Sequence, residues 1–166
     1  MKFSFSRALT LLVISFTFLL AATSCKKSNS SNPNGGMSAS VSGTAWSANY
    51  PIAGIYSSGI GEFVIGGLQF KGGDSTVFEI SVFTPFTLNR AINSDTTNDD
   101  IQYVDTKTGQ AYDGGQSSGW SILTVTSYDS TGHKIGGTFK GVLYNVSGGS
   151  DSLTITNGSF STSYTP

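Results

Sequence analysis

Hydrophobic and polar side chains alternate along several stretches of the chain from about residue 39 onward. In residues 75–83, STVFEISVF, the side chains of Phe78, Ile80 and Val82 alternate with smaller or polar neighbours. An alternation with period two is typical of strands that bury one face, and no stretch of this domain has the 3.6-residue period of an amphipathic helix. The pattern therefore predicts an all-β domain.

Turn-forming residues divide these stretches into hairpins. The sequence KGGD at 71–74 predicts one turn, and DSTG at 129–132 predicts a second. Asn157 and Gly158 tolerate the positive φ angles of a tight turn, so residues 152–164 are expected to form a further hairpin. Expected strands outside the two later hairpins are 38–42, 45–49, 62–70, 75–83 and 101–105.

The number of strands and turns indicates the fold class. About eight short strands with Gly-rich turns fit a single antiparallel β-sandwich or a barrel-like meander. We assign this domain to residues 38–166, a length that can bury a substantial core without disulfides.

The first 24 residues have the layout of a cleaved, helical secretory signal peptide. Lys2 and Arg7 precede an apolar segment from Ala8 to Ala22, and small residues follow it. The apolar segment is shorter than the roughly 20 residues that span a bilayer. A cleaved signal is therefore favoured over a membrane helix.

Cys25, the chain's single cysteine, directly follows these small residues. This arrangement resembles the bacterial lipobox, and the resemblance implies that Cys25 becomes the first residue of the mature chain and carries diacylglycerol and palmitate. Three acyl chains hold a protein firmly, whereas one gives only reversible binding. No second cysteine is available for an intramolecular disulfide.

Residues 25–37 are predicted to be the lipidated cysteine and a flexible tether, because Ser, Asn, Pro and Gly dominate them. Lys26 stands where an aspartate would favour retention in the inner membrane, so we expect anchoring to the outer membrane, on its periplasmic or its outer side. Cleavage leaves seven basic against ten acidic side chains, a net charge of −3. Scattered basic residues exclude a nucleic-acid binder.

Three motifs suggest a family. The opening SGTAW at 42–46, the segment LTVTSYDSTGHKIGGTFKGVL at 123–143 and the closing LTITNGSFSTSY at 153–164 resemble a group of small, uncharacterised Gram-negative lipoproteins with a β-rich domain of unknown function. The shared motifs are turn glycines and core aromatics. The resemblance therefore implies an exported β-rich domain and transfers no functional residues.

Common catalytic and cofactor signatures are missing from the sequence. One histidine, His133, and no cysteine apart from Cys25 make a zinc site or a Ser-His-Asp triad improbable. The sequence contains no P-loop and no Gly-rich motif that opens a helix. A carboxylate pair is the remaining route to hydrolysis, and Glu62 and Glu79 are its candidates. We therefore predict a protein that is not an enzyme and needs no cofactor, with a hydrolase as an alternative.

An acidic segment at 93–109 offers a weak calcium site as a further alternative. Asp95, Asp99, Asp100 and Asp105 carry the hard oxygen ligands that calcium prefers, although their spacing differs from that of an EF-hand. A solvated loop explains the same composition.

Aromatic side chains provide the second binding hypothesis. Alternation turns Trp120 away from the predicted core, and Tyr103 and Tyr112 flank the segment 105–119. Planar rings with a polar handle can stack on sugar faces or pack at the edge of a core. The sequence thus leaves three readings: a membrane-anchored protein that binds or assembles with other envelope proteins, a glycan-binding accessory module, and a hydrolase.

Overall fold

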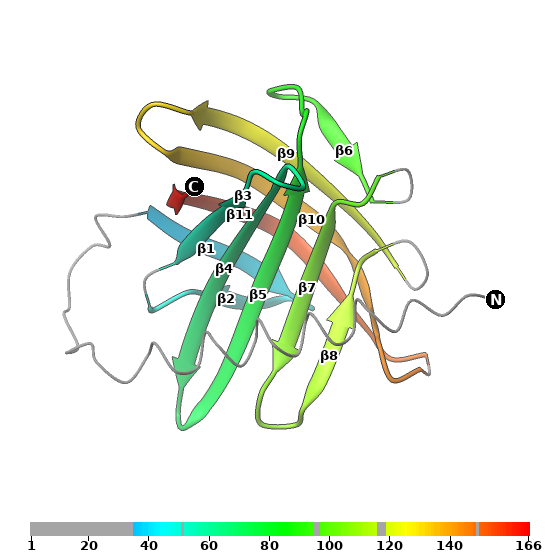
Figure 1. The fold of residues 1–166 in the computed structure, drawn as a ribbon. Coiled ribbons are helices and arrows are strands. Elements are labelled where there is room, and N and C mark those ends of the chain that lie inside the picture. Colours follow the sequence, from blue (N-terminus) through cyan, green and yellow to red (C-terminus); the bar gives the residue numbers. More distant parts are fainter. Residues whose placement is uncertain (1–34, 51, 95–96, 116–118, 149) are drawn as a thin grey trace. The chain divides into compact units, whose positions relative to one another are not determined.

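A computed structural model describes residues 35–50, 52–94, 97–115, 119–148 and 150–166 (Figure 1). These residues contain eleven strands and no helix, which confirms the all-β class and corrects the expected number of about eight. The strands are β1 (Gly35–Val41), β2 (Thr44–Ser47), β3 (Ala53–Ser57), β4 (Glu62–Lys71), β5 (Asp74–Phe83), β6 (Ala91–Asn93), β7 (Asp100–Asp105), β8 (Gln110–Asp113), β9 (Trp120–Asp129), β10 (Lys134–Asn145) and β11 (Ser152–Thr165).

All described strands belong to one sheet with the order β2-β1-β11-β3-β4-β5-β7-β8-β10-β9-β6. Strand β11 also pairs with β10, so the strands from β11 through β3, β4, β5, β7 and β8 to β10 form a closed ring. The pairing of β11 with β3 is parallel, which makes the sheet mixed rather than purely antiparallel. The described strands therefore close one sheet on itself instead of stacking two sheets.

The core fills the inside of this sheet. Along β5 the side chains of Phe78, Ile80 and Val82 are fully buried, as the alternation predicted. Neighbouring strands add Phe63, Ile65 and further apolar side chains to the same cluster. Full burial of each such side chain stabilises the fold by about 1.5–3 kcal/mol.

Two of the predicted hairpins are confirmed. Strands β4 and β5 pair along their whole length, and the loop between Lys71 and Asp74 consists of Gly72 and Gly73, both with positive φ. A two-residue turn of this kind requires positive φ at both positions, which glycine adopts without strain. Strands β9 and β10 form the second hairpin.

The hairpin predicted at Asn157 and Gly158 is wrong. Residues 152–165 form one strand, β11, in which Asn157 has a φ of 52°. The pairing registers with β1 and β10 both shift here by one residue, which marks a β-bulge. Strand β11 lies between β1 and β10 and pairs with both of them. The hydrogen bonds of these two pairings keep the strand continuous and outweigh the local preference of Asn157 and Gly158 for a turn.

The ends of the elements also differ from expectation. Strand β1 begins at Gly35, and Met37 is buried, so the last three residues assigned to the tether belong to the domain. The short strands β3, β6 and β8 were not expected. The signal peptide and residues 25–34 lie outside the described residues. Within the described part of the chain, no helix is long and apolar enough to cross a membrane.

Candidate functional site

Two exposed aromatic side chains lie next to each other on the outer face of the sheet. Trp120, at the start of β9, is 39% exposed, and Tyr144, near the end of β10, is 36% exposed. Trp120 pairs with Val142, two residues before Tyr144 on the same face of β10. Diagonal neighbours of this kind have Cα atoms about 7–8 Å apart, within reach of aromatic rings. The rings of Trp120 and Tyr144 thus share one surface.

Acidic and amide side chains continue this surface across the sheet. Tyr144 of β10 lies directly opposite Asp113 of β8, which lies opposite Gln102 of β7. Asp100 is on the same face of β7, two residues before Gln102. We call this set of residues the aromatic-acidic surface; its members are Trp120, Tyr144, Asp113, Gln102 and Asp100.

The carboxyl groups of Asp100 and Asp113 are hydrogen-bonded to each other. Asp100 also accepts hydrogen bonds from the backbone N–H of Ile101 (2.6 Å) and from Nε2 of Gln102 (3.0 Å). Asp113 accepts one from the backbone N–H of Gly115. A Cβ at position 115 would lie 2.8 Å from Asp113 Oδ1 and 3.3 Å from Asp100 Oδ1, so a glycine leaves both carboxyl groups room to converge there.

This arrangement changes the protonation of the pair. Burial first, and the charge of Asp113 second, raise the pKa of Asp100 to about 7, while hydrogen bonds from Gln102 and Ile101 act in the opposite direction. A second carboxyl group this close disfavours the ionised form of Asp100, so Asp100 keeps its proton up to near neutral pH. The aromatic-acidic surface therefore combines two stacking rings with a carboxyl pair that can both donate and accept a hydrogen bond.

The other two predicted ligand-binding aromatics point the opposite way. Tyr112 is buried, and its hydroxyl lies 2.7 Å from Asp151 Oδ2 and 2.9 Å from Gln110 Oε1. Tyr103 is half-buried and packs edge-on against Phe78 at 4.9 Å between ring centroids. Tyr103 and Tyr112 therefore do not share the outer face with Trp120, because register turns them toward the core, and ligand binding by these two residues stays a prediction.

Tyr144 takes their place, and the sequence contained a signal for it. The alternation that places Leu143 in the core turns Tyr144 outward. Asp113 was harder to find, because β8 has only four residues, QAYD, too few to show a clear period.

The predicted calcium ligands Asp99 and Asp105 accept hydrogen bonds from backbone N–H groups. Asp99 is buried, and its Oδ1 accepts a hydrogen bond from the backbone N–H of Phe83 at 2.7 Å. Asp105 lies at the other end of β7 from Asp100, about 17 Å away along the strand, and accepts from the backbone N–H of Lys107. Asp95 and Cys25 lie outside the described residues. Within the described ranges no group of three or more metal-ligating side chains converges, and calcium binding here stays a prediction.

Glu62 and Glu79, the candidate hydrolytic pair, share the outer face of the β4–β5 hairpin. Glu79 lies opposite Gly66, four residues along β4 from Glu62, a distance of about 13 Å along the strand. Burial, and then the charge of Glu62, raise the pKa of Glu79. Glycosidases hold their two carboxyl groups about 5–9.5 Å apart, so this backbone spacing does not favour a catalytic pair.

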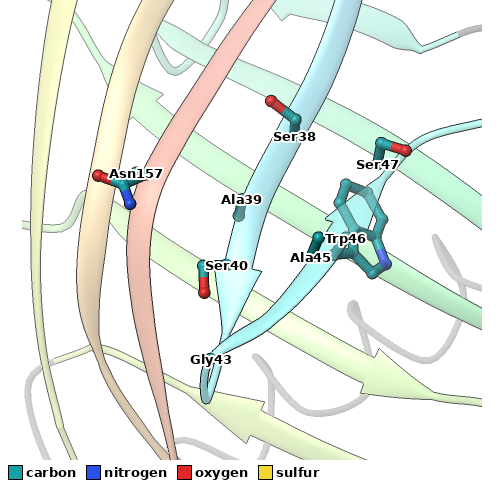
Figure 2. A pocket seen from close by; sticks show the side chains of 8 residues that line it. All are labelled: Ser38, Ala39, Ser40, Gly43, Ala45, Trp46, Ser47 and Asn157. Atoms are coloured by element: carbon teal, nitrogen blue, oxygen red, sulfur yellow. The ribbon is translucent and has the colours of Figure 1, made fainter.

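An open hollow lies over β1 and β2 (Figure 2). It is lined by Ser38, Ala39, Ser40, Gly43, Ala45, Trp46, Ser47 and Asn157. Trp46 is buried, and its indole N–H donates to Thr76 Oγ1 at 2.7 Å. Since this lining contains no acid and no base, the hollow offers hydroxyl and amide groups only.

Comparisons with known protein families, with curated proteins and with solved structures find no match to this chain. Among the described residues, the aromatic-acidic surface is the strongest candidate for a binding site, because it combines exposed rings with hydrogen-bonding groups.

Proposed function

We propose that this protein is an envelope lipoprotein, anchored to the outer membrane through acyl chains on Cys25, that binds a ligand without transforming it. The signal-like segment 1–24, the cysteine that follows it and the polar residues 26–34 support the anchor. The domain then acts as a binding module held close to the membrane. The motif resemblance to small Gram-negative lipoproteins is consistent with this role.

A glycan is the ligand class that the aromatic-acidic surface fits best. The observation that carries this choice is the exposed pair Trp120 and Tyr144 on adjacent, hydrogen-bonded strands. Aromatic rings present an apolar face to the C–H groups of a sugar ring, and the carboxyl and amide groups of Asp113, Asp100 and Gln102 can pair with sugar hydroxyls. These side chains stand on paired strands, so binding a ligand does not require a loop to become ordered, which favours affinity.

Two alternatives remain. Assembly with another envelope protein would use the same exposed rings, since aromatic side chains are enriched at protein interfaces. Hydrolysis by Glu62 and Glu79 would need their carboxyl groups to come within the distance that glycosidases use. The four-residue offset between the two positions along the hairpin works against this. The glycan proposal is preferred because it uses both the rings and the polar row.

Replacing both rings by alanine (W120A together with Y144A) is expected to weaken glycan binding by about 1000-fold, because centrally placed aromatic residues each contribute on the order of 2 kcal/mol and every 1.4 kcal/mol is a tenfold change in affinity. A glycan array on the full chain identifies the ligand, and titration calorimetry measures the affinity. Both side chains are more than a third exposed, so the fold should survive the change.

The matched control for this experiment is Phe70→Ala, which removes an equally exposed aromatic ring (43%) at the end of β4. It should leave the affinity unchanged. Unaltered binding by the double variant with a native circular dichroism spectrum would contradict the proposed site. Absence of binding to any glycan would move the proposal to a protein partner.

Cys25→Ser is expected to remove the chain from the membrane fraction and to abolish incorporation of radiolabelled palmitate, because only the thiol can receive the diacylglycerol group. Ser28→Ala, three residues later, is the matched control and should keep both properties. Retention of the Cys25→Ser chain in washed membranes would show that something other than the lipid holds it there.

A further inference from the structure

Three exposed apolar side chains lie on neighbouring segments at one end of the closed sheet, while Phe70 and Val146 are exposed near the other end. Ile60, in the turn between β3 and β4, is 63% exposed, and Leu88, in the segment after β5, is 45% exposed. Tyr128, at the end of β9, is 39% exposed. Large apolar side chains grouped on a surface mark an interaction site more often than scattered ones do.

Hydrogen bonds and ring contacts hold these segments together. The backbone N–H and the hydroxyl of Thr84 both donate to the carbonyl of Gly61, at 2.7 and 3.0 Å, which ties the segment after β5 to the turn that carries Ile60. The backbone N–H of Asn89, next to Leu88, donates to the carbonyl of Val125 on β9. We call the group Ile60, Leu88 and Tyr128 the apolar rim.

A cluster of aromatic rings supports the apolar rim from below. Tyr128 packs against Phe86 at 5.4 Å, Phe63 at 5.7 Å and Tyr164 at 6.2 Å between ring centroids. Phe63 is fully buried and Tyr164 nearly so. Tyr128 is therefore the exposed member of a packed aromatic cluster, and the hydrogen bonds of Thr84 and Asn89 tie the segments that carry Ile60 and Leu88 to the same end of the sheet.

The chain enters the domain at this same end. Gly35, the first residue of β1, lies opposite Thr162 of β11. Two residues further along β11, the backbone N–H of Tyr164 donates to the carbonyl of His133, in the turn between β9 and β10. Figure 1 shows the start of β1, the C-terminus and the β9–β10 turn toward one end of the sheet, and the β4–β5 and β7–β8 turns toward the other.

The length of chain before Gly35 keeps this end near the anchor. Ten residues, 25–34, connect the lipid-bearing Cys25 to β1. Ten residues span at most about 33–36 Å even when fully extended. The end with the apolar rim is thus held within a short distance of the bilayer that the anchor occupies.

Charge at this end does not oppose contact with lipid. The three side chains of the apolar rim carry no charge, and the segments around them carry charges of both signs: Arg90 and Lys134, with Glu62, Asp129 and, around the start of β7, Asp99 and Asp100. Tyrosine is enriched at the level of lipid headgroups, and exposed Ile and Leu side chains insert into the boundary between headgroups and acyl chains. The uncharged side chains of the apolar rim therefore suit binding to a membrane by insertion rather than by attraction between charges.

We propose that the apolar rim rests in the headgroup region of the membrane to which the lipid anchor holds the chain. This inference relies on the proposed anchor at Cys25. It orients the domain, because Trp120 lies at the opposite end of β9 from Tyr128, about 26 Å along the strand. The aromatic end of the aromatic-acidic surface then faces away from the bilayer and is open to a ligand.

Quenching by brominated lipid tests this orientation. The full chain, held by its own lipid in phosphatidylcholine vesicles with or without brominated acyl chains, is compared with the single variants Ile60→Trp and Leu88→Trp. The matched control is Thr108→Trp, an exposed position in the turn between β7 and β8 at the other end. The wild-type chain measures the background from Trp46 and Trp120.

We expect fluorescence quenching at positions 60 and 88 to exceed the wild-type background by at least about twofold, whereas Thr108→Trp should match it. Equal quenching at all three positions would overturn the proposal. Mass spectrometry reports separately on Cys25. If its thiol carries no lipid, the proposed anchor fails, and the same variants coupled through Cys25 to a maleimide lipid still decide which end of the domain meets the bilayer.

Discussion

Replacing Phe78 by alanine is expected to lower the free energy of unfolding by about 3–5 kcal/mol. Phe78 is fully buried on the inner face of β5. Its ring packs against Trp46 at 4.7 Å, Tyr103 at 4.9 Å and Phe139 at 5.5 Å. Truncation leaves a cavity that these three rings, held on different strands, cannot close.

Urea denaturation followed by circular dichroism measures this loss. Phe70→Ala is the control on the neighbouring strand, since Phe70 is 43% exposed and should cost less than about 1 kcal/mol. A Phe78→Ala loss no larger than the control's would mean that the core of the closed sheet is not centred on this ring.

The stability of the domain is expected to fall as the pH rises from about 4 to about 7. The pKa of Asp100 is raised from 3.8 to about 7, so the folded chain holds this proton more tightly than the unfolded chain does. Stabilisation by the protonated Asp100 is complete below the pKa that this group has in the unfolded chain, and it is lost as the pH rises through the pKa of the folded chain. Each pKa unit between the folded and the unfolded chain corresponds to about 1.4 kcal/mol of stability. Because solvent screening reduces this contribution, we expect the free energy of unfolding to fall by about 1–3 kcal/mol over this pH range.

Asp100→Asn should remove most of this pH dependence and make the chain more stable than wild type at pH 8, because an amide carries no charge to repel Asp113. Urea denaturation at pH 4, 6 and 8 measures the effect. A smaller slope should persist, since burial raises the pKa of Glu79 in the same direction. Asp105→Asn, which keeps an acceptor for the turn after β7, is the control and should retain the wild-type slope. A wild-type slope in Asp100→Asn would contradict the raised pKa of Asp100.

Predictions from local sequence succeeded where the local signal and the final packing agree. The alternation in 75–83 identified the buried face of β5, and Gly72 and Gly73 identified its turn. Both features depend on residues within a few positions of each other. The same reasoning failed at Asn157 and Gly158, because pairing with β1 and β10 on both sides of β11 decides the conformation there.

The candidate site was predicted only in part for the same reason. Trp120 was expected on the surface and is exposed. Tyr112 was expected beside it, but its side chain points into the core from β8, a strand too short to show its period. The pairing of Tyr144 with Asp113, and the contact of Asp113 with Asp100, join segments that are far apart in the chain.

The sequence by itself determined that the domain is all-β, that residues 75–83 and 121–146 turn their apolar side chains inward, and that no common catalytic motif is available. These properties follow from side-chain alternation and composition, which need no partner. Tertiary structure alone decided that eleven strands close into one sheet, that Trp120 and Tyr144 share a surface, and that the apolar rim lies at the end where the chain enters. Each of these depends on the register between distant strands, and a shift of one residue would turn every side chain to the other face.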